Sequence, residues 1–117
     1  MTHLWRVYRM RDPLTKETRY IGITSQTLTS RLAFHLRGND HNPEKQSWIT
    51  DLGKQGLRPE IEQIDSLYGT KASAEQRERQ WVYRYLIQGA ILLNQKHIPG
   101  SQEHLRAFLR ANKKVIC

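Results

Sequence analysis

The alternation of apolar and polar positions along the chain predicts a small mixed α/β fold. β-prone runs predict three strands, at residues 4–10, 19–23 and 60–65. Helical periodicity predicts four helices, at residues 28–37, 44–55, about 73–88 and 101–112. The turn-forming pair Asp12-Pro13 separates the first two strands, so we expect an antiparallel hairpin. The alternation of the third run breaks, and its acidic residues favour an edge strand or a solvent-facing strand.

Apolar positions within the helical segments mark the expected core. In the first helix they are Leu28, Leu32, His35 and Leu36. In the second they are Trp48, Ile49 and Leu52, and in the third Trp81, Val82, Tyr85 and Leu86. Each set falls on one face of its helix. A chain of 117 residues is long enough to bury one such core.

Charge is the compositional feature that narrows the function. The formal net charge is +8, and a basic domain attracts polyanions, of which nucleic acid is the commonest. Residues 1–41 hold seven Lys or Arg against three Asp or Glu, and residues 71–114 hold nine against three. Residues 42–70 hold three against five. On charge alone, a basic protein without a nucleic-acid partner remains the alternative.

The rest of the composition indicates an intracellular, cytoplasmic protein. No apolar run approaches the ~18–20 residues that a membrane span needs. The first residues lack the apolar segment of a secretory signal. Cys117 is the only cysteine, which excludes an internal disulfide and a four-cysteine zinc site.

Each strand of the predicted hairpin carries a tyrosine. Side chains alternate along a strand, so Arg6, Tyr8 and Met10 share one face of the first strand. Tyr20 and Gly22 share one face of the second, and both tyrosines can point to the same side. Cross-strand aromatic packing is the more frequent reason for such a pair. A glycine inside a strand indicates a bulge or a close approach of backbone or ligand.

The helix after the hairpin adds a basic pair. Arg31 and His35 are four positions apart and share a flank of the apolar face. Alone, such an arginine usually extends to water and such a histidine usually packs in the core. Together, and facing two tyrosines, they are candidates for a functional site.

A glutamate continues the apolar face of the helix at 73–88. Glu78 lies one turn before Trp81 on the inward side, where burial of an unpaired carboxylate is costly. Two interpretations remain open at this point. Glu78 forms a structural salt bridge with a basic residue such as Arg31, or it binds a metal ion.

These motifs, in this order, resemble the GIY-YIG nuclease superfamily over residues 4–95. The segments that carry the resemblance are the strand with Tyr8, Tyr20-Ile21-Gly22, the helix with Arg31 and His35, Trp48-Ile49, the third strand, Glu78 with Trp81-Val82, and Leu92-Leu93-Asn94. The resemblance implies an α/β (α+β) fold with a three-stranded antiparallel sheet flanked by helices. We expect a catalytic domain at 1–95 and a C-terminal helical extension, packed on it, at 96–117.

The resemblance also implies an endonuclease that hydrolyses DNA phosphodiester bonds with one divalent ion, Mg²⁺ or Mn²⁺. Glu78 would be the only protein ligand of that ion, consistent with a hard cation that keeps most of its waters. Arg31 would brace the scissile phosphate and stabilise the negative charge of its transition state.

The remaining residues of the site follow from the same resemblance. Tyr8 or Tyr20 would orient or deprotonate the attacking water, and His35 would assist the tyrosine. A free tyrosine has a pKa of about 10, so this role needs nearby positive charge. Asn94 would hold the site together by hydrogen bonding.

One position departs from the family pattern. Arg6-Val7-Tyr8 stands where the motif has Gly-Ile-Tyr, so a large cation replaces a glycine. Arg6 would either crowd the site or add a phosphate contact. The other basic side chains expected to contact nucleic acid are Arg9, Arg19, Arg37 and Lys71.

Two other functions compete with the nuclease. A catalytically inactive nucleic-acid-binding module of the same fold would bind DNA with a steep salt dependence and never cut it. A basic protein–protein adaptor is the weaker alternative. If the chain is a nuclease, three alternatives stay open: low sequence specificity, a preference for a DNA structure or for single strands, or reliance on a homodimer or a partner protein for specificity.

Overall fold

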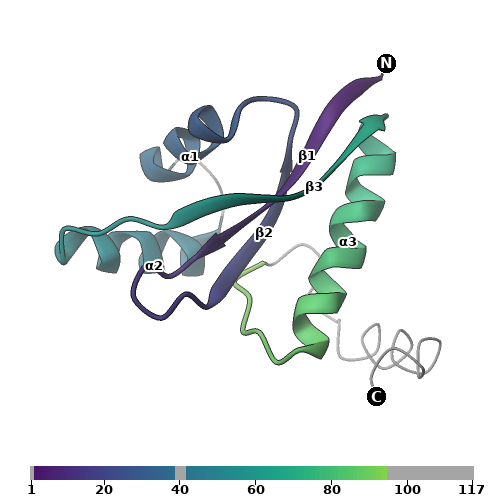
Figure 1. Cartoon of the computed structure of the whole chain (residues 1–117). Coiled ribbons are helices and arrows are strands. Elements are labelled where there is room, and N and C mark those ends of the chain that lie inside the picture. The colour runs from purple at the N-terminus through teal and green to yellow at the C-terminus, as the bar shows by residue number, and fades with distance from the viewer. Residues whose placement is uncertain (1, 39–41, 95–117) are drawn as a thin grey trace.

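The computed structural model describes residues 2–38 and 42–94. Within them, three antiparallel strands form one sheet in the order β2-β1-β3. The elements are β1 (His3–Arg11), β2 (Thr18–Thr24), α1 (Leu28–Arg37), α2 (Pro43–Lys54), β3 (Glu60–Gly69) and α3 (Lys71–Ile87). Helix α3 lies on one side of the sheet and α1 and α2 on the other (Figure 1). The predicted α+β fold with a three-stranded antiparallel sheet is confirmed.

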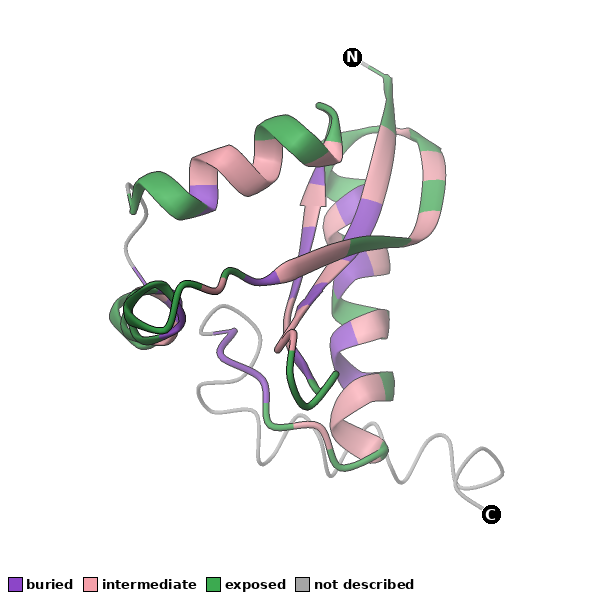
Figure 2. Cartoon of the chain, turned by 60° about the vertical axis from the view of Figure 1, so that its left-hand side comes forward, coloured by how far each residue is buried: buried purple, intermediate pink, exposed green. Residues whose placement is uncertain are grey.

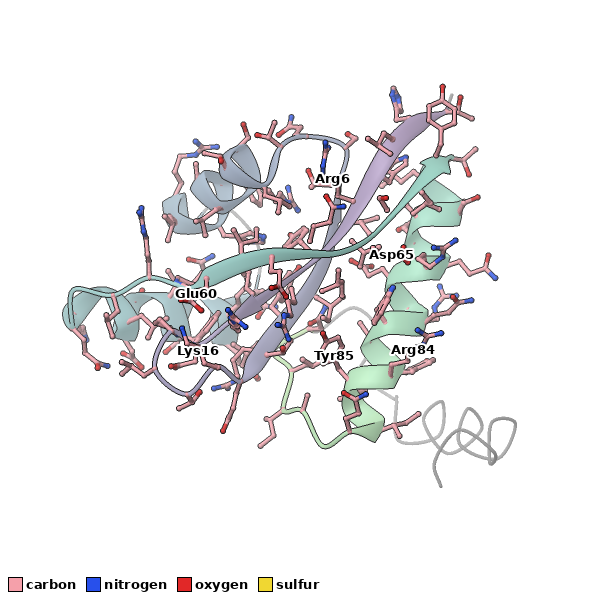
Figure 3. The ribbon with its side chains drawn as sticks, viewed as in Figure 1. Arg6, Lys16, Glu60, Asp65, Arg84 and Tyr85 are labelled. Carbon is pink, nitrogen blue, oxygen red and sulfur yellow. The ribbon has the colours of Figure 1, made fainter. Side chains whose placement is uncertain are left out.

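The turn between β1 and β2 is built on Asp12. Its Oδ1 accepts hydrogen bonds from the backbone N–H groups of Leu14 (2.8 Å) and Thr15 (3.1 Å). Lys16 then adopts a left-handed backbone conformation with φ 63°, and its Nζ lies 2.9 Å from a carboxylate oxygen of Glu60 (Figure 3). The turn predicted from Asp12-Pro13 is therefore present and is tied to the start of β3.

The register of the hairpin sends neighbouring residues to opposite faces. Tyr8 pairs with Gly22 and Val7 with Ile23. Val7 belongs to the buried apolar cluster, which also contains Ile21, Val82, Tyr83 and Leu92. Figure 2 shows the buried stretches of β1 and β2 between the helices on either side. Both faces of the hairpin are thus covered, one of them by α3.

Strand β3 is longer than the sequence predicts. It runs to Gly69, and the expected end at Asp65 is wrong. The register against β1 shifts between Val7 and Tyr8, which leaves Ile64 as an extra residue in β3. This bulge interrupts the period of two, and the interruption made the strand look shorter. The expected edge position is confirmed.

The residue after the bulge links β3 to α3. Asp65 Oδ2 accepts hydrogen bonds from Arg77 Nη1 (2.8 Å) and from Trp81 Nε1 (2.9 Å). In Figure 3 the Asp65 side chain points toward α3. The two contacts set the height of α3 along the sheet, and that height determines where Glu78 lies.

The helices begin at side-chain caps. Thr27, Asn42 and Thr70 each accept a hydrogen bond from a backbone N–H in the first turn of α1, α2 and α3. The predicted apolar face of α1 is wrong at Leu36, which is 38% exposed, whereas His35 is fully buried. Helix α1 turns His35 rather than Leu36 toward the sheet, where the histidine ring lies within hydrogen-bond distance of Tyr8 in β1.

Part of the predicted architecture lies outside the described residues. The helix expected at 101–112 and the extension expected at 96–117 belong to this part, so the division of the chain after residue 95 stays a prediction. None of the helices described is long and apolar enough to cross a membrane.

Candidate active site

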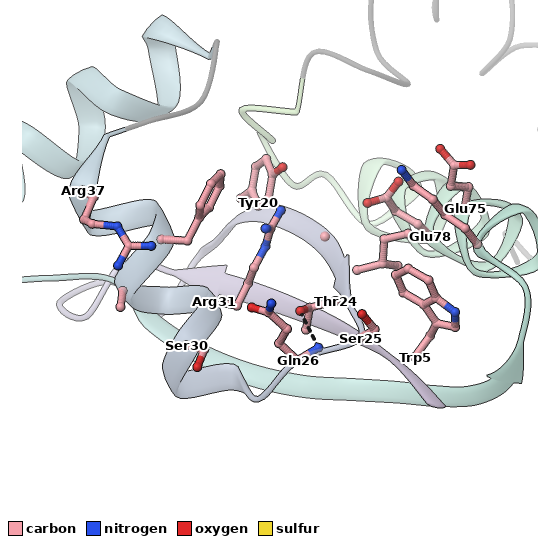
Figure 4. Close-up of a pocket in the computed structure, with 15 residues that line it drawn as sticks. Trp5, Tyr20, Thr24, Ser25, Gln26, Ser30, Arg31, Arg37, Glu75 and Glu78 are labelled. Carbon is pink, nitrogen blue, oxygen red and sulfur yellow. Dashed lines mark hydrogen bonds between the residues drawn. The ribbon is translucent and has the colours of Figure 1, made fainter. Parts of the chain in front are cut away.

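A polar cavity of about 760 Å³ opens between α1 and α3, along the second half of β2 and the loop that follows it. Arg31 and Arg37 line it from α1, and Glu75 and Glu78 line it from α3. Figure 4 shows the two arginines on one side of the cavity and the two carboxylates on the other. Thr24 at the end of β2 and Ser25 and Gln26 in the loop after it also line the cavity, as do Trp5, Tyr20, Phe34 and Lys71.

The hydroxyl of Tyr8 is the centre of a buried hydrogen-bond network behind this cavity. Tyr8 Oη lies 2.7 Å from His35 Nε2, and Arg31 Nε donates to it at 3.2 Å. The Arg31 guanidinium also lies 4.4 Å from the centre of the Phe34 ring, which fixes its orientation from a second side. Burial raises the pKa of Tyr8 to about 12, and Arg31 opposes that rise. At neutral pH Tyr8 is therefore the phenol.

Tyr20 lies on the same side of the sheet as Tyr8. The two ring centroids are 6.4 Å apart, and the Tyr20 ring is 5.4 Å from the His35 ring. The prediction that both tyrosines face one side is confirmed. Burial raises the pKa of Tyr20 too, with the charges of Tyr8 and Glu78 acting in the same direction. Tyr20, unlike Tyr8, lines the cavity.

Gly22 is where Tyr8 approaches the backbone of β2. A Cβ added at Gly22 would overlap the hydroxyl and the ring carbon that bears it. The close approach expected of this glycine is therefore made by the tyrosine opposite it. Any larger residue would displace Tyr8 from Arg31 and His35.

Glu78 comes to the cavity from the other side of the sheet. It is 7% exposed and lines the cavity with Arg31 and Tyr20. Its carboxylate is near enough to contribute to the raised pKa of both Tyr8 and Tyr20, after burial. The sequence placed Glu78 on the inward face of its helix, and the structure brings it to the tyrosines.

Asn94 joins the site through the backbone. Its side chain accepts from the N–H of Ile21 (2.9 Å) and donates to the carbonyl of Ile21 (2.6 Å). Ile21 lies between Tyr20 and Gly22 on the outer edge of β2, so Asn94 occupies the position that a further strand would fill. This contact holds the tyrosine strand in place without touching the cavity.

The basic residues predicted to contact nucleic acid divide into two sets. Arg37 and Lys71 line the cavity, and Arg6 donates to the carbonyl of Gln26 in the loop that borders it (3.3 Å). Arg9 lies on the other face of the sheet, where it pairs with Glu62 at 2.7 Å. The Arg19 guanidinium donates to the Ile91 carbonyl (3.0 Å) and lies 5.9 Å from the Trp48 ring.

Sequence reasoning missed Lys45 on α2. Its side chain is fully buried, with Nζ 2.8 Å from His35 Nδ1 and 4.7 Å from the centre of the Tyr20 ring. The signal was present, because Lys45 lies four residues before the buried Ile49 on the inward face of the helix. A similar step of one turn, back from Trp81, identifies Glu78 on its helix.

The carboxylate oxygens around the cavity suit a divalent metal ion that prefers oxygen ligands. Within residues 2–38 and 42–94, no three His, Cys, Asp or Glu side chains cluster to form a closed metal cage. One or two carboxylates facing an open polar cavity instead suit Mg²⁺ or Mn²⁺, whose shell is completed by water and substrate phosphate. Glu78 is the inner carboxylate of the pair, and Glu75 lies one turn earlier.

This α+β domain brings an arginine, a tyrosine and a carboxylate to one polar cavity, with a second tyrosine bonded to the arginine behind it, and these groups are able to bind a phosphate and a metal ion. A family model described as the GIY-YIG catalytic domain matches residues 4–86. The chain therefore belongs to the GIY-YIG family, a family of nucleases. No curated protein and no solved structure matches the chain.

Proposed function

We propose that this protein is a metal-dependent endonuclease that hydrolyses DNA phosphodiester bonds. The observation that carries the proposal is the opposition, across one cavity, of Arg31 on α1 and Glu78 on α3, with Tyr20 in the cavity wall and Tyr8 bonded to Arg31 behind it. Family membership supports nuclease chemistry, and the net charge of +8 supports a polyanionic substrate.

Each side chain has a role that follows from its position. Arg31 would bind a non-bridging oxygen of the scissile phosphate and stabilise the charge that grows there in the transition state. Glu78 would hold Mg²⁺ or Mn²⁺. A divalent cation there supplies positive charge that neutralises the phosphate and lowers the pKa of nearby acids.

A tyrosine would orient the attacking water and, after releasing its own phenol proton to solvent, accept the proton of that water. Tyr8 is the better candidate for proton acceptance, because Arg31 donates to its oxygen and His35 lies within hydrogen-bond distance of it. Tyr20 lines the cavity and would position the water or the phosphate. Asn94 would keep both tyrosines in register by pairing with the backbone of Ile21.

One such site cuts one strand. A double-strand break would therefore need two subunits or two successive events, and a homodimer or a partner protein would supply sequence or structure preference. The competing function is that of an inactive module of the same fold, which binds DNA through the same basic side chains and never cuts it.

The test is cleavage of supercoiled plasmid and of single-stranded DNA with Mg²⁺, Mn²⁺ or EDTA. We expect metal-dependent nicking by the wild type and loss of at least about 100-fold in Glu78→Ala, with DNA binding retained. Glu44→Ala removes an exposed carboxylate on α2 and is the matched control. Tight binding without cutting under any metal would favour the inactive module, and undiminished cutting by Glu78→Ala would reject the proposed metal ligand.

A further inference from the structure

Four side chains from three elements form one continuous hydrogen-bonded array, and three of the four are fully buried. Lys45 Nζ on α2 lies 2.8 Å from His35 Nδ1 on α1, and His35 Nε2 lies 2.7 Å from Tyr8 Oη on β1. Arg31 Nε completes the array at 3.2 Å from the same Tyr8 oxygen. Lys45, His35 and Tyr8 are each fully buried. The roles assigned so far use His35, Tyr8 and Arg31 but leave Lys45 without one.

Donor and acceptor counting settles the direction of each hydrogen bond. A lysine ammonium has three donors and no acceptor, so His35 Nδ1 must accept from it. A neutral imidazole with an accepting Nδ1 carries its hydrogen on Nε2, which therefore donates to Tyr8. An arginine is always a donor. Tyr8 Oη thus accepts two N–H hydrogen bonds, from His35 and from Arg31, and directs its own hydrogen elsewhere.

The charge states agree with this count. Burial, together with the charges of Lys45 and Arg31, lowers the pKa of His35 to about 3, so the imidazole is neutral. Burial and Arg31 lower the pKa of Lys45 to about 8, so most of the lysine still carries its charge at neutral pH. The Tyr20 ring, 4.7 Å from Nζ, gives the buried ammonium a favourable neighbour.

A lysine is a costly choice for a position that only needs to fill space. Burying its ammonium carries a desolvation penalty that methionine, of similar length, would avoid. In return, the charged lysine fixes which neighbouring atoms donate a hydrogen bond to Tyr8. Burial raises the pKa of Tyr8 to about 12, and two N–H donors on its oxygen oppose that rise, because they stabilise the phenolate, the form that accepts a proton from water.

We propose that Lys45 is a positioning residue that fixes His35 as the Nε2–H tautomer and so makes Tyr8 Oη the acceptor of two N–H donors. The tautomer itself is a property of the free protein. Only its catalytic consequence rests on the proposed nuclease function. That consequence is that Tyr8, and not Tyr20, is the tyrosine whose deprotonation two N–H donors favour. The phenol proton of Tyr8 would first leave to solvent, and the phenolate would then accept a proton from the attacking water.

The first experiment measures the tautomer in metal-free, DNA-free protein. Long-range ¹H–¹⁵N correlation spectra at neutral pH distinguish a protonated from an unprotonated ring nitrogen, and His35→Gln assigns His35 among the five histidines. We expect protonated Nε2 and unprotonated Nδ1 in the wild type and in Lys45→Arg. In Lys45→Met, Tyr8 can donate to Nε2, and the Nδ1–H tautomer should appear.

Lys54→Met changes an exposed lysine at the end of the same helix and should leave the spectrum unchanged. An Nδ1–H tautomer in the wild type would overturn the proposal, as would an unchanged His35 spectrum in folded Lys45→Met. The wild-type spectrum alone decides the matter if Lys45→Met does not fold.

The second experiment measures DNA nicking. Lys45→Met should lower kcat about 10- to 100-fold with KM near the wild-type value, the usual effect of losing a partner behind a reacting group, and Lys45→Arg should recover most of it. A wild-type kcat in Lys45→Met would overturn the catalytic consequence. Absence of cutting by the wild type with any metal would count against the nuclease function, while the tautomer measurement would stand independently.

Discussion

Both faces of the β1–β2 hairpin are buried, but apolar packing stabilises one face and directional hydrogen bonds stabilise the other. Val7 and Tyr8 are neighbours in β1, and both are fully buried. Val7 packs with Ile21 and Val82 in an apolar cluster, where contacts are many and non-directional. Tyr8 faces His35 through a short hydrogen bond. Loss of one apolar group costs stability, whereas loss of one polar group leaves its partner unsatisfied and changes the chemistry.

The largest effect should come from the polar face. Tyr8→Phe keeps the ring but removes the oxygen that Arg31 Nε donates to. We expect DNA cleavage to fall about 10²- to 10⁴-fold, and the free energy of unfolding to fall by about 1–3 kcal/mol as buried donors lose their acceptor. Plasmid nicking and urea unfolding measure the two effects.

Two further variants calibrate that result. Tyr68→Phe, on a side chain that is 72% exposed, should match the wild type in both assays. Tyr20→Phe should lose less activity than Tyr8→Phe. If Tyr8→Phe cleaved DNA at the wild-type rate, the polar face would not be needed for the chemistry and would not differ from the apolar face in this respect.

A substitution on the apolar face should lower the free energy of unfolding and leave the cleavage activity unchanged. Ile21→Ala deletes a fully buried side chain from the cluster and should cost about 2–5 kcal/mol. Its backbone contacts with Asn94 remain, so the cleavage rate per folded molecule should not change. Urea unfolding checks the first expectation, and nicking well below the melting temperature checks the second. Ile91→Ala, at a side chain that is 73% exposed, should stay within about 0.5 kcal/mol of the wild type.

The polar face should also make stability depend on pH. Burial lowers the pKa of His35 to about 3, so between about pH 6.5 and 3 the unfolded chain binds a proton that the folded protein does not. This contribution is complete above pH 6.5 and is lost as the pH falls, by about 2 kcal/mol at pH 5. His35→Gln should lack it. Urea unfolding of both proteins at pH 7, 6 and 5 tests this, and parallel pH profiles would contradict it.

The smallest expected effect is on DNA binding, and it should differ between basic residues on the two faces of the sheet. Arg37 lines the cavity, so Arg37→Gln should weaken DNA binding and reduce its salt dependence by about one phosphate contact. Arg9 is paired with Glu62 on the other face, so Arg9→Gln should leave binding nearly unchanged and cost under about 1 kcal/mol of stability. Fluorescence anisotropy in EDTA across a salt series measures the binding, and equal losses in the two variants would refute the assignment.

Much of the site was accessible from local patterns. The period of two in the hairpin put Tyr8 and Tyr20 on one side, and the spacing of four in α1 put Arg31 and His35 together. Those are properties of neighbouring residues in one element. The end of β3 was missed because the bulge at Ile64 needs a partner strand to define it. Lys45 was missed because a buried lysine makes sense only beside His35 of another helix.

The sequence by itself determined the elements, the faces of the hairpin and the candidate groups, because strand and helix periods are local consequences of backbone geometry. Only the tertiary structure decided that Glu78, from a helix on the opposite side of the sheet, reaches the cavity that Arg31 lines. It also decided which nitrogen atoms lie within hydrogen-bond distance of Tyr8 Oη. Both depend on how separate elements pack. The spacing of residues within one helix or strand does not determine the distances of a few ångströms between side chains of different elements.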